Sequence, residues 1–323
     1  MADHTAVTAQ DHPGALLGVD VGGTTVKARL VRADGAVSAE PLWERRVPTP
    51  RDDVDASRTV AAIAALVDEA RTVAPTAAVG LVVPGVVDDA AGVAVRSVTL
   101  GWREVPLRDL LARASGLPVG FGQDVRAGAL AEATSGAGAG RAGGLAFVPV
   151  GTGLASAFVA DGQALASGGW AGEIGQVVLT APESLAGLRV EEVASAGALA
   201  RRLGVPHARA ATDLVRAGEP AAVAAWDDLV AVLADCLAWI TAVAAPETLV
   251  VGGGLALAGD LLFDPLGAAL DVRLAASRRP ALVPALHGDA AAMVGAALLA
   301  GQAVGAGAAA GRGAAHRATE VLA

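Results

Sequence analysis

The sequence contains two similar units in which a glycine- and threonine-rich loop joins two apolar strands. In the first unit, residues 16–21 form the apolar run, Gly22, Gly23, Thr24 and Thr25 form the loop, and residues 26–30 alternate between apolar and basic. In the second, the loop Gly151, Thr152 and Gly153 lies between residues 145–150 and 154–159. Short apolar runs and period-two alternation are typical of strands. Two copies predict two related domains that face one ligand; the alternative is a chance likeness between two β-hairpins.

Both loops have the chemistry of an anion site. Backbone N–H groups of a glycine turn can point together at a phosphate, because no Cβ blocks the approach. The Walker and dinucleotide loops are excluded, since both require a helix after the glycines and a strand follows here. A third cluster, Gly252, Gly253 and Gly254, follows an apolar strand at 248–251 and precedes an apolar helix. We expect the first two loops to hold the β- and γ-phosphates of ATP.

Two aspartates stand at positions where a carboxylate could act on such a ligand. Asp20 directly precedes the first loop, where it suits Mg²⁺, which takes one or two carboxylates and keeps several waters. The alternative is a buried aspartate that caps the turn. Asp124 follows a short strand at 118–122 and opens a helix. It is either the N-cap of that helix or a general base for phosphoryl transfer to a hydroxyl.

Strands and helices alternate along the chain, which indicates an α/β architecture. Helical patterns are expected at 55–74, 106–115, 124–134, 191–203, 220–245, 260–277 and 289–300. We expect a small N-terminal domain of residues 15–122 plus about 289–303 and a larger C-terminal domain of residues 123–288. The glycine- and alanine-rich segment 135–144 reads as a hinge-like loop. Residues 1–14 are expected to be a disordered N-terminus and 304–323 a low-complexity tail.

The composition of the chain excludes several classes of function. The chain has 323 residues, a net charge of −9 and one cysteine, Cys236. No basic stretch could follow a nucleic-acid backbone, and one cysteine excludes an internal disulfide or a zinc site of several thiolates. The apolar stretch 221–245 carries three aspartates and reads as a buried helix. Residues 1–14 do not resemble a secretory signal. We expect a cytoplasmic protein with a small-molecule substrate and no nucleic-acid or membrane partner; a homodimer is left open.

The motifs occur in the order found in the ROK family (repressors, open reading frames, sugar kinases), which the chain resembles. Seven blocks carry the resemblance: 17–31, 83–88, 100–107, 123–132, 150–153, 171–175 and 250–254. The resemblance implies an actin/hexokinase-like fold, related to ribonuclease H, whose two domains close over ATP and a sugar. It implies that Asp124 is the general base for the 6-hydroxyl and that the glycine cluster at 252–254 binds adenosine. Glu173 and Glu191 would bind ring hydroxyls, with Glu192 as the fallback for Glu191.

The chain departs from the family pattern at several sugar-site positions. Thr99 and Gln123 replace asparagines, and Gln176 replaces a histidine that in the family binds sugar and zinc. The zinc cysteines are also missing; Pro182, Ser184 and Arg189 stand roughly in their place. A chain without Tyr or Asn, with Lys27 as its one lysine, is typical of a GC-rich genome. That bias explains the lost asparagines but not the lost histidine and cysteines. We therefore predict no zinc and an altered sugar pocket; the role of Lys27 is left open.

These departures leave three readings of the function. The first is a kinase for a glucose relative, such as an aminosugar of the kanosamine type or a C7-cyclitol in antibiotic biosynthesis. The second is an ordinary glucokinase of primary metabolism, and the third a sugar-binding protein without catalysis. A repressor is disfavoured, because little sequence precedes the first phosphate motif and a helix-turn-helix region would not fit there.

Overall fold

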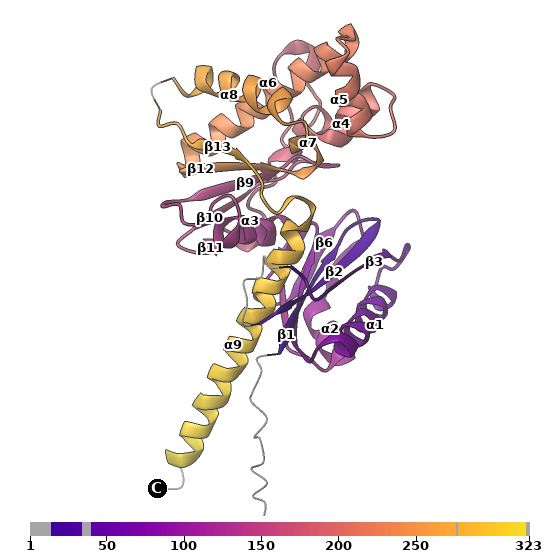
Figure 1. Cartoon of the computed structure of the whole chain (residues 1–323), viewed down its shortest axis with the longest axis vertical. Helices are drawn as coiled ribbons and strands as arrows, with labels where there is room; N and C mark the ends of the chain where they lie inside the picture. Colours follow the sequence, from indigo (N-terminus) through magenta and orange to yellow (C-terminus); the bar gives the residue numbers. More distant parts are fainter. Residues whose placement is uncertain (1–13, 34–39, 276, 321–323) are drawn as a thin grey trace, which may run out of the picture.

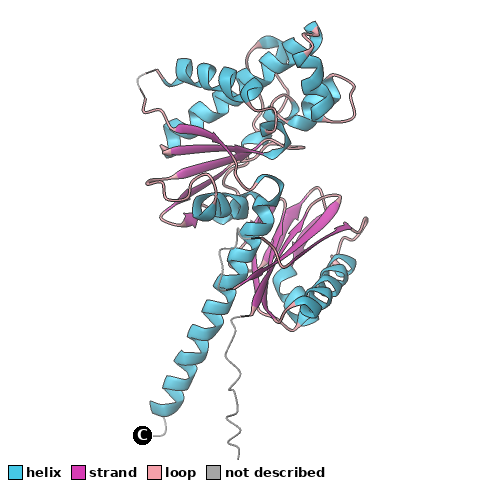
Figure 2. Ribbon diagram, viewed as in Figure 1, coloured by secondary structure: helices cyan, strands magenta, loops and turns pink. Residues whose placement is uncertain are grey.

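The computed structural model describes residues 14–33, 40–275 and 277–320, with side chains described to Gly305. The expected disordered N-terminus therefore lies outside the described residues, apart from Gly14. The described chain forms two α/β domains, one above the other in Figure 1. Figure 2 shows a separate sheet in each domain, with helices packed outside the sheets. This arrangement confirms the predicted two-domain α/β fold.

The N-terminal sheet has the strand order β3-β2-β1-β4-β8. Strands β1, β2 and β3 are antiparallel neighbours, whereas β4 and β8 run parallel to β1. The strands are β1 (Ala15–Val21), β2 (Thr25–Arg32), β3 (Trp43–Pro48), β4 (Thr76–Val83) and β8 (Val119–Gln123). Helices α1 (Ser57–Val73) and α2 (Leu107–Ser115) lie on one side of the sheet and α9 (Ala291–Glu320) on the other (Figure 1).

The C-terminal sheet repeats this topology with the order β11-β10-β9-β12-β13. Its first three strands are again antiparallel, and its last two again run parallel to the first in sequence. They are β9 (Leu145–Pro149), β10 (Ala157–Ala160), β11 (Gln163–Ala164), β12 (Thr248–Gly252) and β13 (Ala281–Pro284). The shared topology supports the expectation that two copies of one strand–loop–strand unit lie in related domains.

The remaining elements extend each domain. A small antiparallel sheet of β5 (Val86–Asp88), β6 (Val93–Ser97) and β7 (Trp102–Val105) belongs to the N-terminal half. The C-terminal domain adds α4 (Ala196–Arg202), α5 (Ala208–Arg216), α6 (Pro220–Ala244), α7 (Gly253–Ala256) and α8 (Asp260–Leu274). Leu229, Leu233 and Leu237 of α6 are fully buried in its core. This core consists mainly of Ala, Val and Leu, because aromatic residues make up only 3% of the chain.

A row of three glycines seats α9 directly on the N-terminal sheet. Gly18, Gly80 and Gly120 are register partners on β1, β4 and β8. A Cβ at these positions would lie 2.2, 1.7 and 2.2 Å from backbone carbonyl oxygens of α9. Any larger residue would therefore push the helix off the sheet. The helix continues to Glu320, so the expected tail at 304–323 is helical as far as the structure describes it.

Helix α9 also contains an apolar window that could be mistaken for a membrane span. Within the described part of the chain, Gly288–Gly305 is the stretch long and apolar enough to cross a membrane, judged by length and composition alone. In the structure, 39% of this window is buried, and Ala297 and Ala300 pack against Leu16 and Ala78 of the sheet. The window is thus part of the protein core.

The expected helix at 191–203 begins later than predicted. Residues 190–192 form a single 3₁₀ turn, and α4 begins at Ala196. Ser195 is the N-cap: its hydroxyl accepts a hydrogen bond from the Ala198 N–H and donates to the Glu191 carbonyl. This cap holds Glu191 outside the helix.

One buried carboxylate joins two segments that lie far apart in the sequence. Glu132 of α3 (Asp124–Ser135) is completely buried. It accepts hydrogen bonds from the Ala137 N–H at 2.8 Å, the Leu286 N–H at 3.1 Å and the His287 N–H at 2.8 Å. The first donor lies in segment 135–144, which joins α3 to β9 within the C-terminal domain, and the other two lie just before α9. A carboxylate with three N–H donors is strongly satisfied, so Glu132 couples segment 135–144 to the start of α9.

Candidate active site

A cavity of about 610 Å³ is lined by residues of both domains. Its wall includes all six residues predicted to bind substrate, which are Thr99, Gln123, Asp124, Glu173, Gln176 and Glu191. The second glycine loop, Gly151, Thr152 and Gly153, lines the same cavity. These motifs therefore converge on one cavity, although they are spread over almost a hundred residues. Of the described residues, the lining does not include Asp20, the first glycine loop (residues 22–25) or the third glycine cluster (residues 252–254).

Asp124 is the first residue of α3, which follows directly on strand β8. Its Oδ1 accepts a hydrogen bond of 2.8 Å from the Val125 N–H. Burial raises the pKa of the Asp124 carboxyl to about 6, although this hydrogen bond and the Arg126 charge oppose the rise. A carboxyl whose pKa lies near neutrality is suited to accept a proton.

The N-cap alternative for Asp124 is wrong. The cap residue is Gln123, whose side-chain oxygen accepts a 2.8 Å hydrogen bond from the Arg126 N–H. Gln123 thus caps the helix from a buried position and also lines the cavity. Asp124 is left free for another role.

Asp20 lies at the end of β1, where only 8% of the residue is exposed. Burial raises the pKa of its carboxyl to about 7; the Asp124 carboxylate raises it further, and Lys27 opposes the rise. The effect of the Asp124 carboxylate on this pKa means that the two carboxyls lie near enough to interact electrostatically. The alternative that Asp20 caps the turn gains no support, because within the described part of the chain its carboxylate pairs with Lys27 and not with the loop backbone.

Lys27, whose role the sequence left open, bridges two aspartates. Its Nζ lies 3.8 Å from an Asp20 oxygen and 2.5 Å from Oδ1 of Asp289. Arg46 on β3 pairs with the other Asp289 oxygen at 2.9 Å. Asp289 lies in the 3₁₀ turn Gly288–Ala290 just before α9, so Lys27 connects the first phosphate motif to the start of that helix.

The first loop is held by one threonine. Thr49 Oγ1 donates a 2.7 Å hydrogen bond to the Gly22 carbonyl, and the Thr49 N–H donates to the Thr24 carbonyl at 3.0 Å. The turn itself closes through the Gly22 N–H and the Thr25 carbonyl at 3.0 Å. Gly23 lies against Thr99, since a Cβ there would stand 2.4 Å from the Thr99 methyl carbon. The first loop is thereby adjacent to the cavity wall.

The third glycine cluster packs against Val150, the residue that precedes the second glycine loop. The Val150 N–H donates to the Gly252 carbonyl at 2.9 Å. Gly253 has φ of +75°, and a Cβ there would stand 2.5 Å from the Val150 carbonyl oxygen. Both constraints require glycine at this position. Gly252 and Gly254 flank it at the junction of β12 and α7.

The predicted sugar-binding carboxylates lie together on the C-terminal side of the cavity. Burial raises the pKa of the Glu173 carboxyl, and the nearby Glu191 carboxylate raises it further. Glu191 lies against Gly153, because a Cβ there would stand 2.9 Å from Glu191 Oε2. The fallback, Glu192, instead turns back to accept a hydrogen bond from the Arg189 N–H at 2.8 Å. The geometry therefore favours Glu191.

Sequence reasoning missed two features of the site. Arg126 lies just behind the cavity lining, is buried, and donates from Nη2 to both Asp89 carboxylate oxygens at 2.9 and 3.0 Å. Its charge acts on both Asp124 and Glu173. An arginine on the first turn of an otherwise apolar helix was a usable signal. Trp170 lines the cavity and is 61% exposed. Its position depends on an irregular glycine turn that no local pattern reveals.

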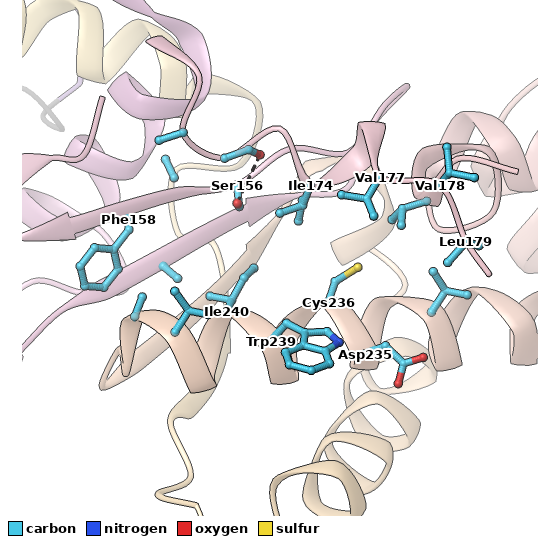
Figure 3. A pocket seen from close by; sticks show the side chains of 18 of the residues that line it. Ser156, Phe158, Ile174, Val177, Val178, Leu179, Asp235, Cys236, Trp239 and Ile240 are labelled. Carbon is cyan, nitrogen blue, oxygen red and sulfur yellow. Dashed lines mark hydrogen bonds between the residues drawn. The ribbon is translucent and has the colours of Figure 1, made fainter. Parts of the chain in front are cut away.

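A second cavity, of about 640 Å³, lies between the segment that carries Glu173 and Gln176 and helix α6 (Figure 3). Ile174, Val177, Val178 and Leu179 line it on one side, and Cys236, Trp239 and Ile240 of α6 on the other. Ser156 donates a 3.3 Å hydrogen bond to the Gly172 carbonyl at its edge. The cavity is mostly apolar, and its lining shares the segment that carries Glu173 and Gln176.

The donor set fits magnesium. Asp20 is a nearly buried carboxylate whose pKa burial raises to about 7 despite the opposing charge of Lys27, and a hard cation with a phosphate ligand would satisfy it. Asp20 is therefore the residue that would hold Mg²⁺. Among the described residues, no three His, Cys, Asp or Glu side chains gather as a metal site.

We predict that the active protein contains no zinc. Gln176 and Arg189, at two positions of the family's zinc motif, hydrogen-bond to each other at 2.9 Å, and a guanidinium cannot act as a metal ligand in place of a thiolate. Elemental analysis of purified active protein should give far less than one zinc per chain. Stoichiometric zinc, with activity lost to a chelator and restored by zinc but not by Mg²⁺, would contradict this prediction.

Comparison with known proteins supports the motif resemblance. The ROK family model matches residues 16–303. A glucokinase of Halalkalibacterium halodurans is 31% identical over 281 residues, covering 77% of this chain and 83% of that enzyme. A glucokinase of Streptomyces coelicolor is 30% identical over 315 residues, covering 88% and 96%. The structure of a ROK family glucokinase from Streptomyces griseus with glucose and AMPPNP is similar at a TM-score of 0.75 and 28% identity, covering 90% of this chain and all of that one.

Proposed function

Since this chain belongs to the ROK family and is an ATP-dependent sugar kinase, we propose that it phosphorylates the primary hydroxyl of a hexose or hexose-like ring. The observation that carries the proposal is the raised pKa of Asp124, to about 6, in a cavity shared with a glycine loop and two glutamates. A general base, a phosphate-binding loop and ring-binding carboxylates are the parts that phosphoryl transfer to a sugar requires.

The chain's own groups account for the reaction in three steps. The backbone N–H groups of the two glycine loops bind the phosphates of ATP, while Glu173 and Glu191 accept hydrogen bonds from ring hydroxyls. Asp124 accepts the proton of the primary hydroxyl as its oxygen bonds to the γ-phosphorus, and ADP leaves. Mg²⁺ held by Asp20 would neutralise charge on the phosphates. A pKa near neutrality allows Asp124 to be charged before the transfer and protonated after it.

The substrate is expected to be a glucose relative. Thr99, Gln123 and Gln176 line the cavity where the family pattern has other polar residues, and changed polar contacts discriminate strongly between substrates. An aminosugar of the kanosamine type or a C7-cyclitol is our leading substrate class. Glucose, as in the glucokinases to which the chain is similar, is the alternative.

An ATP-turnover assay with a panel of sugars, aminosugars and cyclitols tests both levels of the proposal. Kanosamine or a cyclitol should give the highest kcat/KM, and glucose a lower one. A preference for glucose would make the protein an ordinary glucokinase. No phosphorylation of any acceptor, despite sugar binding, would favour the inactive sugar-binding protein. We expect the enzyme to act in the cytoplasm on a dissolved small molecule; a homodimer stays open.

The raised pKa values predict an acid limb in the pH profile. Asp124 must be deprotonated to accept a proton, and Asp20 must be charged to hold Mg²⁺. With pKa values of about 6 and about 7 in the free protein, kcat/KM should fall below pH 7, by at least about tenfold between pH 7 and 5. Steady-state kinetics in buffers of constant ionic strength measure this. A flat profile down to pH 5 would contradict the assigned roles.

Closure of the two domains is expected when both substrates bind. The cavity is lined from both domains, and closure would exclude water that otherwise hydrolyses ATP. Small-angle X-ray scattering with sugar and a non-hydrolysable ATP analogue should give a smaller radius of gyration than the free protein. An unchanged radius would count against closure.

A further inference from the structure

The wall that carries Gln176 lies between two cavities. On one side, Gln176 and Arg189 line the active-site cavity. On the other, Ile174, Val177 and Val178 line the apolar cavity behind it (Figure 3). A segment with a cavity at its back lacks the close packing that normally fixes side chains in a protein interior. Val177 and Val178 are more than half exposed, so the position of this segment depends on its backbone pairing with residues 187–190 and on polar contacts of side chains.

One arginine, Arg189, supplies the side-chain polar contacts of this wall. Nη1 of Arg189 lies 2.9 Å from Oε1 of Gln176 and 3.0 Å from Oε1 of Glu191. Its Nε lies 3.4 Å from a Glu192 oxygen, which also accepts the Arg189 N–H. Arg189 thus joins two strand-like segments that already pair through the Val190 N–H and the Val177 carbonyl at 2.9 Å.

We propose that Arg189 is a positioning residue for the sugar: its guanidinium holds Gln176 and Glu191 at a fixed spacing on the cavity wall. The proposal deepens the sugar-kinase function and rests on it. A planar guanidinium with several fixed donors can hold two acceptors at once, whereas a lysine ammonium acts as a point charge.

The contact also fixes what the wall offers to a substrate. Arginine has no acceptor, so the Gln176 amide must turn its oxygen to Arg189 and its NH₂ group away from it. Gln176 is then a donor, and the free oxygen of Glu191 is an acceptor. The substrate group at Gln176 must carry a lone pair, as a hydroxyl does. The group at Glu191 must carry a proton, as a hydroxyl or an ammonium does.

This role predicts a specific pattern of kinetic change. Arg189 is 44% exposed in its side chain, and exposed ion pairs contribute little to folding. Arg189→Ala should therefore leave the melting temperature nearly unchanged. Losing the fixed spacing should raise the KM for the sugar about tenfold or more, since small misplacements of binding groups are costly. The KM for ATP and kcat should change less than about threefold.

The experiment compares Arg189→Ala, Arg189→Lys and the matched control Arg202→Ala. Arg202 also pairs with an acidic residue, Asp228 at 2.6 Å, but on α4 outside the cavity lining. KM and kcat are measured with ATP and the panel sugar that the wild type phosphorylates best. Arg189→Lys should fall between the wild type and Arg189→Ala, and Arg202→Ala should match the wild type.

A second readout does not depend on catalysis. Hydrogen–deuterium exchange of the substrate-free protein should show faster exchange across residues 174–192 in Arg189→Ala than in the wild type or Arg202→Ala. Unchanged exchange together with an unchanged sugar KM would overturn the proposal. If the wild type phosphorylates no sugar, the proposed function fails, and the exchange result alone decides whether Arg189 holds the wall.

Discussion

Replacing Asp124 with Asn is expected to lower kcat by about 10²–10⁴-fold, the usual contribution of a general base. The amide keeps the size of the carboxyl but cannot take the hydroxyl proton. Because the loss appears chiefly in the transition state, kcat and kcat/KM should fall together while the KM for the sugar stays nearly constant. Steady-state kinetics with saturating ATP measure the effect.

Thermal melts of Asp124→Asn and Asp124→Ala provide the control. Gln123, not Asp124, caps helix α3, so neither variant should lose the roughly 1 kcal/mol that a lost cap costs. Removing a buried carboxyl with a raised pKa should not destabilise the fold. If Asp124→Asn keeps more than about a tenth of the wild-type kcat, Asp124 is not the base.

Replacing Asp20 with Asn is expected to abolish most of the activity and to stabilise the ligand-free protein at pH 8. The carboxylate that would hold Mg²⁺ is lost, so kcat/KM should fall by at least about 10²-fold, as for other groups that stabilise charge in the transition state. A pKa raised to about 7 by burial means that the charged form is costly in the fold. About three pH units at 1.36 kcal/mol each give roughly 4 kcal/mol as an upper bound.

The sign of the stability change depends on pH. Between pH 4 and 7 the folded protein binds a proton at Asp20 that the unfolded chain has lost, so this group destabilises the fold increasingly as pH rises. Asp20→Asn should therefore melt several degrees above the wild type at pH 8. The difference should be less than half as large at pH 5, and it should vanish only below about pH 4, where the unfolded chain also keeps the proton. Equal melting temperatures at pH 8 would show that the buried carboxylate is already neutralised.

The sequence could predict those parts of the site that short stretches of chain encode. Gly22–Thr25 form a turn between two strands because glycine and alternation act locally, and Asp124 follows its strand within the same block. The six predicted substrate residues all reach the cavity. Only the family resemblance predicted that they would meet in one site, since no local sequence pattern indicates that Thr99 lies near Glu173.

Contacts between distant segments could not be predicted. Lys27 pairs with Asp289, 262 positions away, and Arg126 pairs with Asp89, 37 positions away. The late start of α4 is a different kind of miss, because Ser195 is a good N-cap and was visible in the sequence. The helical pattern extended across it, and the 3₁₀ turn at 190–192 replaced the first turn of the expected helix.

The glycine row beneath α9 has a consequence for how the gene tolerates variation. Gly18, Gly80 and Gly120 do not line the active-site cavity, yet at each a Cβ would stand within 2.2 Å of the backbone of α9. In a deep mutational scan read out by growth or abundance, these positions should tolerate as few amino acids as Asp124 does. Even alanine should not be tolerated, because its Cβ would clash with the helix. Their defects should appear as loss of folded protein, while those of Asp124 leave protein levels intact. Sequence constancy in this protein would therefore mark two separate requirements, one chemical and one architectural.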